Sequence, residues 1–181
     1  MTERLHRRVA GHHDIRLDGL TDLLLRAPGA SVLDIGCNRG LVGFEFFANG
    51  ASKVHGVDIY AEGIETARHL FCDLRNCESR FEVRDLTKPD ALDWCDAQYT
   101  IVVMLATYHK LKRVMSAGEM SALIGRIGRR TGKYFAWRAT SFDHAANEEE
   151  MRALDRDLGL KRVHTSYLSK DLGVAAIWER K

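Results

Sequence analysis

Polar and glycine residues stand at four points of the chain, each at the end of an apolar run. Three of these points carry an acid, and the fourth carries a tyrosine and a histidine. The first point is the segment Asp34-Ile-Gly-Cys-Asn-Arg-Gly40, and the others are Asp58, Asp85 with Leu86, and the segment from Leu105 to His109. Glycines adopt positive φ and let the backbone approach a ligand closely. Carboxylates accept hydrogen bonds from hydroxyl and amino groups. These four points therefore have the residue types to bind a polar small molecule.

The apolar runs before these points predict β-strands, and the segments between them have helical periodicity. Met120, Leu123, Ile124 and Ile127, for example, would share one face of a helix. Asn147, three residues before Glu150, resembles an N-cap with its reciprocal glutamate, which predicts that the last helix opens there. Seven strands are expected, at residues 31–35, 53–57, 80–83, 99–104, 133–137, 160–165 and 173–178.

Alternating strands and helices predict an α/β fold with a doubly wound, mostly parallel seven-stranded sheet in a single domain. The loop 169–173 is too short for a parallel crossover, so the C-terminal strand is expected to be antiparallel. Residues 1–30 are expected to form a helical cover, and residues 31–181 the domain itself. Ligands of open α/β sheets bind beyond the carboxyl ends of the strands, where the four points would lie.

The glycine segment does not match the dinucleotide-binding pattern G-x-G-x-x-G, because Asn38 and Leu41 stand where glycines are required. It carries instead an acid two residues before Gly36 and a glycine four residues after it. This arrangement resembles the D-x-G-x-G-x-G loop of class I S-adenosylmethionine-dependent methyltransferases, with Asn38 replacing the middle glycine. Asparagine tolerates positive φ better than most residues. The resemblance extends from Val32 to the C-terminal strands.

The resemblance implies S-adenosylmethionine as the cofactor and a role for each point of the chain. The loop would contact the methionine part of the cofactor, Asp58 would take both ribose hydroxyls, and Asp85 would accept from the adenine amino group. Leu105 to Tyr108 would pass beneath the sulfonium. Cofactor-binding residues implied in this way are Asp34, Gly36, Asn38, Gly40, Asp58, Ile59, Asp85, Leu86 and Leu105, and no metal site is predicted.

Each acid also has a simpler structural explanation. Asp34 could cap the following helix, Asp58 could be a turn residue, and Asp85 could stabilise the turn before Thr87. The three acids in order, together with the glycine loop and the antiparallel end, favour the cofactor site.

The acceptor half of the site is less specific. The segment Tyr108-His-Lys-Leu111 lacks the prolines of enzymes that methylate exocyclic amines of DNA, and resembles the Y/F-H-H-L version found in methyltransferases of small molecules, sugars and some RNA ends. His109 would then act as the catalytic base, with Tyr108 sharing the role. The alternative is that His109 only packs or caps a helix. The substrate cover is expected from His12-His13 and the loop 138–146.

Charge and composition leave three functions open. The 181 residues have a net charge of +2, too small to indicate nucleic-acid binding by the whole molecule. The segment 110–133, however, carries seven basic residues and one acid. The sequence predicts methylation of a hydroxyl or amine on a small-molecule or saccharide-like acceptor. The alternatives are an RNA or protein methyltransferase that uses segment 110–133, and a binding protein without turnover.

The sequence contains no stretch of about 20 apolar residues, so no membrane association is expected. The first residues lack the apolar region of an export signal, which predicts a cytoplasmic protein with reduced cysteines. The oligomeric state is not predicted.

Overall fold

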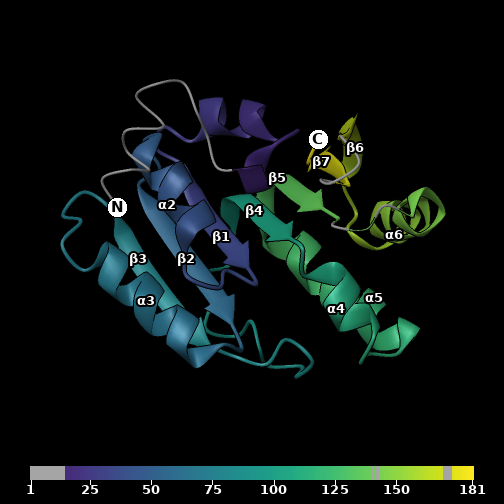
Figure 1. Ribbon diagram of the computed structural model, residues 1–181, viewed down its shortest axis with the longest axis horizontal. Helices are drawn as coiled ribbons and strands as arrows, with labels where there is room; N and C mark the ends of the chain where they lie inside the picture. The colour runs from purple at the N-terminus through teal and green to yellow at the C-terminus, as the bar shows by residue number, and fades with distance from the viewer. Residues whose placement is uncertain (1–14, 140, 142, 169–172) are drawn as a thin grey trace.

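The computed structural model describes residues 15–139, 141, 143–168 and 173–181. All seven expected strands are present in one sheet (Figure 1), with ends that differ from the predicted ones by a few residues. The strands are β1 (Ser31–Ile35), β2 (Lys53–Asp58), β3 (Glu78–Val83), β4 (Tyr99–Leu105), β5 (Thr131–Arg138), β6 (Lys161–Tyr167) and β7 (Val174–Glu179).

The sheet has the order β3-β2-β1-β4-β5-β7-β6. Strand β7 lies antiparallel between β5 and β6, whereas β1 to β5 are parallel to one another. This confirms the predicted doubly wound, mostly parallel sheet with an antiparallel C-terminal strand. Strands β2 and β3 lie on one side of β1, and β4, the next strand along the chain, lies on its other side. The boundary between β1 and β4 is therefore the switch point of the sheet.

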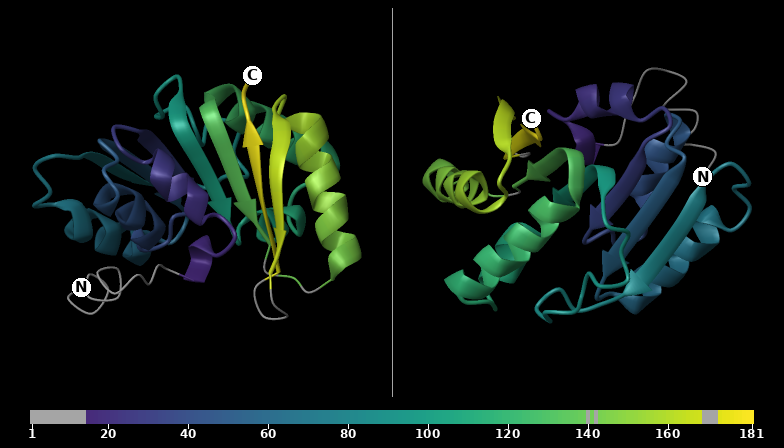
Figure 2. Two further views of the ribbon diagram at one scale, coloured as in Figure 1. Left: turned by 90° about the horizontal axis from the view of Figure 1, so that it is seen from above. Right: turned by 180° about the vertical axis from the view of Figure 1, so that it is seen from behind.

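Helices cover both faces of the sheet (Figure 2), because alternate residues of each strand point to opposite sides. In β1, Val32 belongs to the core beneath α2 and α3, whereas Leu33 and Ile35 belong to the core beneath α4, α5 and α6. The α-helices are α2 (Leu41–Ala48), α3 (Ala61–Phe71), α4 (Tyr108–Lys112), α5 (Ala117–Arg130) and α6 (His144–Asp157).

The structure confirms the apolar face predicted for α5 and corrects the start predicted for α6. The predicted apolar face of α5 is buried, and the helix opens with a capping box between Ser116 and Glu119. The predicted N-cap of α6 at Asn147 is wrong. The helix begins at His144, because the Asp143 carboxylate accepts from the Ala146 N–H and caps it a turn earlier. Asn147 is buried inside the helix and donates to the Ser141 carbonyl.

The segment before β1 forms two 3₁₀ helices, η1 (Ile15–Leu17) and η2 (Thr21–Arg26), within the predicted helical cover. Leu17, Leu20 and Leu23 are buried in the core that contains α2 and α3. His12 and His13, expected to cover the substrate, lie outside the described residues. In the described part of the chain, no helix is both long and apolar enough to cross a membrane.

Candidate functional site

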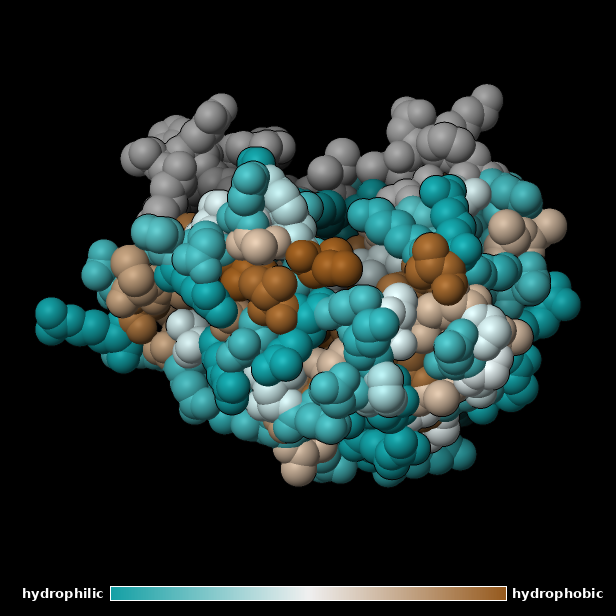
Figure 3. All heavy atoms as spheres, turned by 90° about the horizontal axis from the view of Figure 1, so that it is seen from below, coloured by the Kyte–Doolittle hydropathy of each residue, from teal (hydrophilic) through white to brown (hydrophobic). Residues whose placement is uncertain are grey.

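A cavity of about 350 Å³ lies at the carboxyl ends of β1 to β4, at the switch point of the sheet. Figure 3 views the molecule toward this end of the strands and shows apolar side chains near the middle of the face, among hydrophilic ones. The volume is in the range of small-molecule sites. Its lining consists of Arg16, Asp34, Gly36, Cys37, Asn38, Val42, Asp58, Ile59, Arg84, Asp85, Leu86, Thr87, Leu105, Ala106, Thr107, Lys110, Leu111 and Val114.

The structure brings together the predicted cofactor-binding residues from four separate segments, and all of them except Gly40 line the cavity. Gly40 is instead the N-cap of α2, where a Cβ would come within 2.8 Å of the Ala67 Cβ on α3. It acts on the site through the packing of α2.

The loop between β1 and α2 has the left-handed backbone that its sequence predicts. Gly36, Asn38 and Gly40 have φ of 79°, 48° and 70°. The replacement of the middle glycine by Asn38 is therefore compatible with the loop. A Cβ on Gly36 would collide with the side chain of Thr107, so this glycine also allows the β1 and β4 ends to approach each other.

Asp58 holds the loop and faces the cavity. Its Oδ2 accepts from the Asn38 N–H at 2.8 Å, and its Oδ1 accepts from the Tyr60 N–H at 2.9 Å. A carboxylate has about four lone-pair positions, so each oxygen can still accept one more hydrogen bond. The two backbone donors fix the carboxylate in place, ready to accept a pair of adjacent hydroxyls.

Asp34 lies deeper, only 3 % exposed, on the floor of the cavity. Burial raises its pKa to about 7, with a smaller opposing effect from the Arg16 guanidinium and a reinforcing one from Asp58. Among the described residues, no hydrogen-bond partner reaches its Oδ2. A buried carboxylate oxygen without a donor is costly, and a ligand with an amino group would supply one.

Asp85 forms the turn that was its simpler explanation. The N–H and the hydroxyl of Thr87 both donate to Asp85 Oδ1, at 2.9 and 2.8 Å, and these bonds lower the pKa of the carboxyl. The turn also keeps Asp85 at the cavity wall beside Leu86. Turn formation and ligand binding are thus compatible here.

Several lining residues escaped the sequence reasoning. Arg16 comes from η1, far from any strand end in sequence, and only folding brings it near Asp34. Lys110, Leu111 and Val114 lie three, four and seven residues after Thr107, and this spacing was the available signal for one face of a helical segment.

The predicted catalytic pair lies elsewhere. Neither Tyr108 nor His109 is among the residues that line the cavity, because α4 begins at Tyr108 and turns both side chains away from the face that carries Thr107 and Lys110. Tyr108 is buried, and His109 lines a separate hollow toward α6 with Glu150. Of the segment Leu105 to Tyr108, expected to pass beneath the sulfonium, residues 105 to 107 line the cavity and Tyr108 does not. Burial, Lys110 and Arg113 lower the pKa of His109.

The basic segment 110–133 does not form one uniform positive surface. Lys112 pairs with Glu149 at 3.1 Å, and Lys133 pairs with Glu179 at 3.0 Å. Arg130 donates to the Leu92 carbonyl at 2.8 Å. These three cations come from α4, β5 and α5. Each of them already binds a carboxylate or a carbonyl of the fold.

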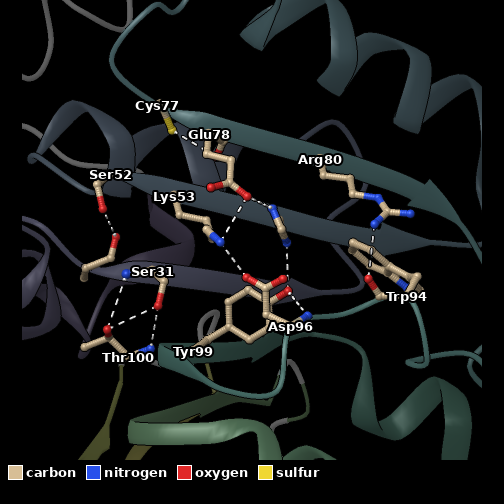
Figure 4. Close-up of polar contacts among 12 residues, drawn as sticks. Ser31, Ser52, Lys53, Cys77, Glu78, Arg80, Trp94, Asp96, Tyr99 and Thr100 are labelled. Atoms are coloured by element: carbon tan, nitrogen blue, oxygen red, sulfur yellow. Dashed lines mark hydrogen bonds and ion pairs between the residues drawn. The ribbon is translucent and has the colours of Figure 1, made fainter.

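Titratable groups also cluster at the opposite end of the strands (Figure 4). Lys53 bridges Glu78 and Asp96 at 3.0 and 2.5 Å, and His55 Nδ1 is 2.7 Å from the Tyr99 hydroxyl. Burial lowers the pKa of His55. This cluster joins the first residues of β2, β3 and β4 and fixes their alignment. In the described residues, no group of three or more histidines, cysteines or acids is arranged to hold a metal ion.

Comparison with known proteins gives a family match over more than half of the chain. Residues 32–131 match the family model described as "Methyltransferase domain". Among curated proteins, a 42-residue segment is 45% identical to a ribosomal protein L11 methyltransferase of Paraburkholderia xenovorans (strain LB400). That alignment covers 23% of this chain and only 14% of the relative's length.

Solved structures share the fold at low sequence identity. A TehB-like S-adenosylmethionine-dependent methyltransferase from Corynebacterium glutamicum superposes with a TM-score of 0.68 at 18% identity, over 99% of this chain and 95% of that one. Magnesium protoporphyrin IX methyltransferase from Synechocystis superposes with a TM-score of 0.67 at 18% identity, over 91% and 78% of the two chains. The N-methyltransferase NodS from Bradyrhizobium japonicum gives 0.65 at 14% identity, over 88% and 93%.

Proposed function

The chain belongs to the methyltransferase domain family, that of the class I S-adenosylmethionine-dependent enzymes, and on this premise we propose that it transfers a methyl group from S-adenosylmethionine to a small-molecule acceptor. The observation that carries the proposal is Asp58, held by two backbone N–H groups at the wall of a cavity at the switch point of the sheet. A carboxylate in this position suits the two ribose hydroxyls of a nucleoside.

The other residues of the cavity fit the remaining parts of this cofactor. The unpartnered Asp34 Oδ2 suits an ammonium group, and Arg16 beside it suits a carboxylate, so the pair complements the amino-acid part. Ile59 and Leu86 offer apolar surface to the adenine ring, with Asp85 next to them to accept from its amino group. Ile59 is 66% exposed in the structure, which such a ring would reduce.

When bound, S-adenosylmethionine supplies a methyl group on a positively charged sulfur, already activated for displacement. The protein residues then have to orient the acceptor in line with the carbon–sulfur bond and exclude water, and orientation alone contributes much of the rate. Leu105, Ala106 and Thr107, at the end of β4, would set this alignment because they join the cofactor half of the cavity to the acceptor half.

A small-molecule acceptor is favoured because the cavity is lined by side chains of this one chain and is of small-molecule size. The sequence pairs the predicted hydroxyl or amine acceptor with His109 as a candidate base, and that imidazole lies outside the lining. An RNA or protein acceptor would have to use segment 110–133, whose paired cations do not favour it.

The test is calorimetric binding of S-adenosylmethionine and S-adenosylhomocysteine to the wild type and to Asp58→Ala. Loss of charge-assisted hydrogen bonds should cost about 1.5–3 kcal/mol, roughly a ten- to hundredfold loss of affinity. Asp73→Ala is the matched control, because this carboxylate is exposed just after α3 and does not line the cavity. Equal binding by Asp58→Ala and Asp73→Ala, or no binding by a correctly folded wild type, would refute the proposed site.

A further inference from the structure

The cavity lining divides into two halves of different chemistry. Asp34, Asp58 and Asp85 all lie on the half formed by β1, β2 and β3. The half formed by β4 and the segment after it, residues 105–114, contributes no carboxylate, imidazole or thiol among the described residues that line the cavity. Its polar side chains are the hydroxyl of Thr107 and the ammonium of Lys110.

Neither of these side chains is suited to take a proton from an acceptor. A lysine ammonium only donates hydrogen bonds, and a threonine hydroxyl is not a base at neutral pH. Thr107 Oγ1 already donates to the Leu105 carbonyl at 3.1 Å, which fixes its orientation. Under the proposed function, the Asp34 carboxylate binds the ammonium group of the cofactor in the opposite half of the cavity. A neutral alcohol would therefore find no group in the acceptor half of the described lining to remove its proton.

From this juxtaposition, and resting on the proposed function, we infer that the acceptor is a carboxylic acid, methylated on its carboxylate oxygen. A carboxylate reaches the cavity already deprotonated, so the transfer needs no base. One carboxylate oxygen forms a bond to the methyl carbon, the bond between that carbon and sulfur breaks, and its electron pair stays on sulfur. The negative and positive charges cancel, giving a methyl ester and a neutral thioether with no proton released.

Lys110 provides the attraction that such an acceptor requires. It sits one helical turn after Thr107, at the wall of the acceptor half, and its ammonium can donate hydrogen bonds to a carboxylate. The same charge repels the protonated form in which most amines exist at neutral pH. The acceptor half of the wall thus favours anions over amines.

The remaining surface of this half is apolar, so the carboxylate is expected on an apolar body. Leu111 lines the wall, and Val114 is 72% exposed at its outer end. Across the cavity, Ile59 is also exposed.

The experiment compares three probes with one aromatic body: naphthoate, naphthylmethanol and naphthylmethylamine. Each is titrated by fluorescence into the protein saturated with S-adenosylhomocysteine, whose own binding is measured first. We expect naphthoate to bind at least about fivefold more tightly than the other two, and Lys110→Gln to remove about that factor. Lys112→Gln is the matched control, because it removes the same charge from the same helix without touching the cavity.

A second readout identifies the product. Carboxylic acids are screened with methyl-labelled S-adenosylmethionine, and the products are treated with alkali, which releases methanol from esters but leaves ethers and methylamines intact. Alkali-labile product supports the inference. Alkali-stable product, equal binding of the three probes, or equal effects of Lys110→Gln and Lys112→Gln would overturn it while leaving the proposed function intact. Failure of S-adenosylhomocysteine to bind would instead overturn the proposed function.

Discussion

The three carboxylates of the cavity have the same chemistry in solution, and their surroundings give them different properties. Asp58 receives two backbone N–H groups, and Asp85 receives two hydrogen bonds from Thr87 that lower its pKa. Asp34 is buried with one oxygen lacking a described partner, and its pKa rises to about 7. A charged form is stabilised by donors and penalised by desolvation. Asp34 is therefore the one whose charge depends on pH near neutrality.

This property predicts a pH dependence of cofactor binding. Below pH 7 the ligand-free protein holds Asp34 mainly protonated, whereas an ammonium group beside it favours the carboxylate. Binding should therefore release a proton, and affinity should rise as pH increases from about 5.5 to 7.5, by at most tenfold per pH unit. Calorimetry of S-adenosylmethionine binding in buffers with different ionisation enthalpies at pH 6.5 measures the released proton.

Asp34→Asn supplies the control for this prediction, because it keeps the shape of the side chain and cannot ionise. It should bind more weakly above pH 7 and lose the pH dependence. The pH dependence of folding stability tests the direction of the Asp34 pKa shift independently. A raised acid pKa penalises the folded state as pH rises from 3.8 toward 7. Asp34→Asn should thus be more stable than the wild type at pH 8, and an affinity that is flat with pH in the wild type would contradict the assignment.

His109 is the residue for which sequence and structure disagree most about chemistry. If His109 were the base, its replacement by alanine would lower turnover by about 10²–10⁴-fold. Since it lines a hollow with Glu150 and not the cavity, we expect His109→Ala to keep turnover within a few-fold of the wild type. Steady-state kinetics with an acceptor found by the screen decide this. A fall of a hundredfold with unchanged cofactor affinity would restore the catalytic role predicted from the sequence.

At the scale of elements, the ends of β1 and β4 meet under unusual backbone geometry. Gly36 at the end of β1 has positive φ, and Ala106, directly after β4, has φ of 56°. Alanine in this region costs about 1–2 kcal/mol. The Ala106 N–H donates to the Arg138 carbonyl at 2.9 Å, which holds the strained residue in place. The close approach brings Thr107 against Gly36 and forms the floor between the two halves of the cavity.

Gly36→Ala is expected to lower stability as well as binding. The added Cβ would be strained by the positive φ and would also collide with Thr107, for a total of about 2–4 kcal/mol. Urea unfolding measures this cost.

Gly29→Ala is the control for backbone strain alone, because Gly29 has φ of 72° and nothing lies within 4 Å of an added Cβ. It should cost about 1 kcal/mol. Thr107→Ala should reduce the penalty of Gly36→Ala in a double-mutant cycle. Equal penalties for Gly29→Ala and Gly36→Ala would show that contact with Thr107 contributes nothing.

At the scale of the whole molecule, charge is dispersed over the fold. The net charge is +2, and the basic side chains of segment 110–133 leave from α4, α5 and β5. Lys112 and Lys133 each lie within 3.1 Å of a glutamate. Part of the positive charge of this segment is thus paired locally with acids.

We therefore expect weak RNA binding with a shallow salt dependence. A footprint of four or more cations would give a slope of log affinity against log salt near −3 for single strands, whereas about −1 or shallower is expected here. Fluorescence polarisation with a labelled oligonucleotide measures the slope. A steep slope that disappears when Lys110, Arg126 and Arg129 are neutralised would support the RNA acceptor instead.

The sequence by itself determined the order and type of the main elements and the loop chemistry. Apolar runs such as 31–35 and 99–104 are local signals, as is the i, i+3, i+4 pattern of α5. The left-handed backbone at Gly36 and Gly40 follows from residue type. Local patterns carry this information because strand burial, helix faces and turn geometry depend on neighbours in the chain. The start of α6 was missed because two capping residues competed locally, and Asp143 was the one used.

Tertiary structure alone decided which side chains share the cavity. Arg16 is brought to Asp34 by the packing of η1, and Asp34 acquires its raised pKa only through burial. The direction of α4 after β4 places Thr107 and Lys110 in the lining and turns His109 away. A rotation of one residue in a helix moves a side chain by about 100°, and packing against α5 and α6, rather than the local sequence, determines that rotation.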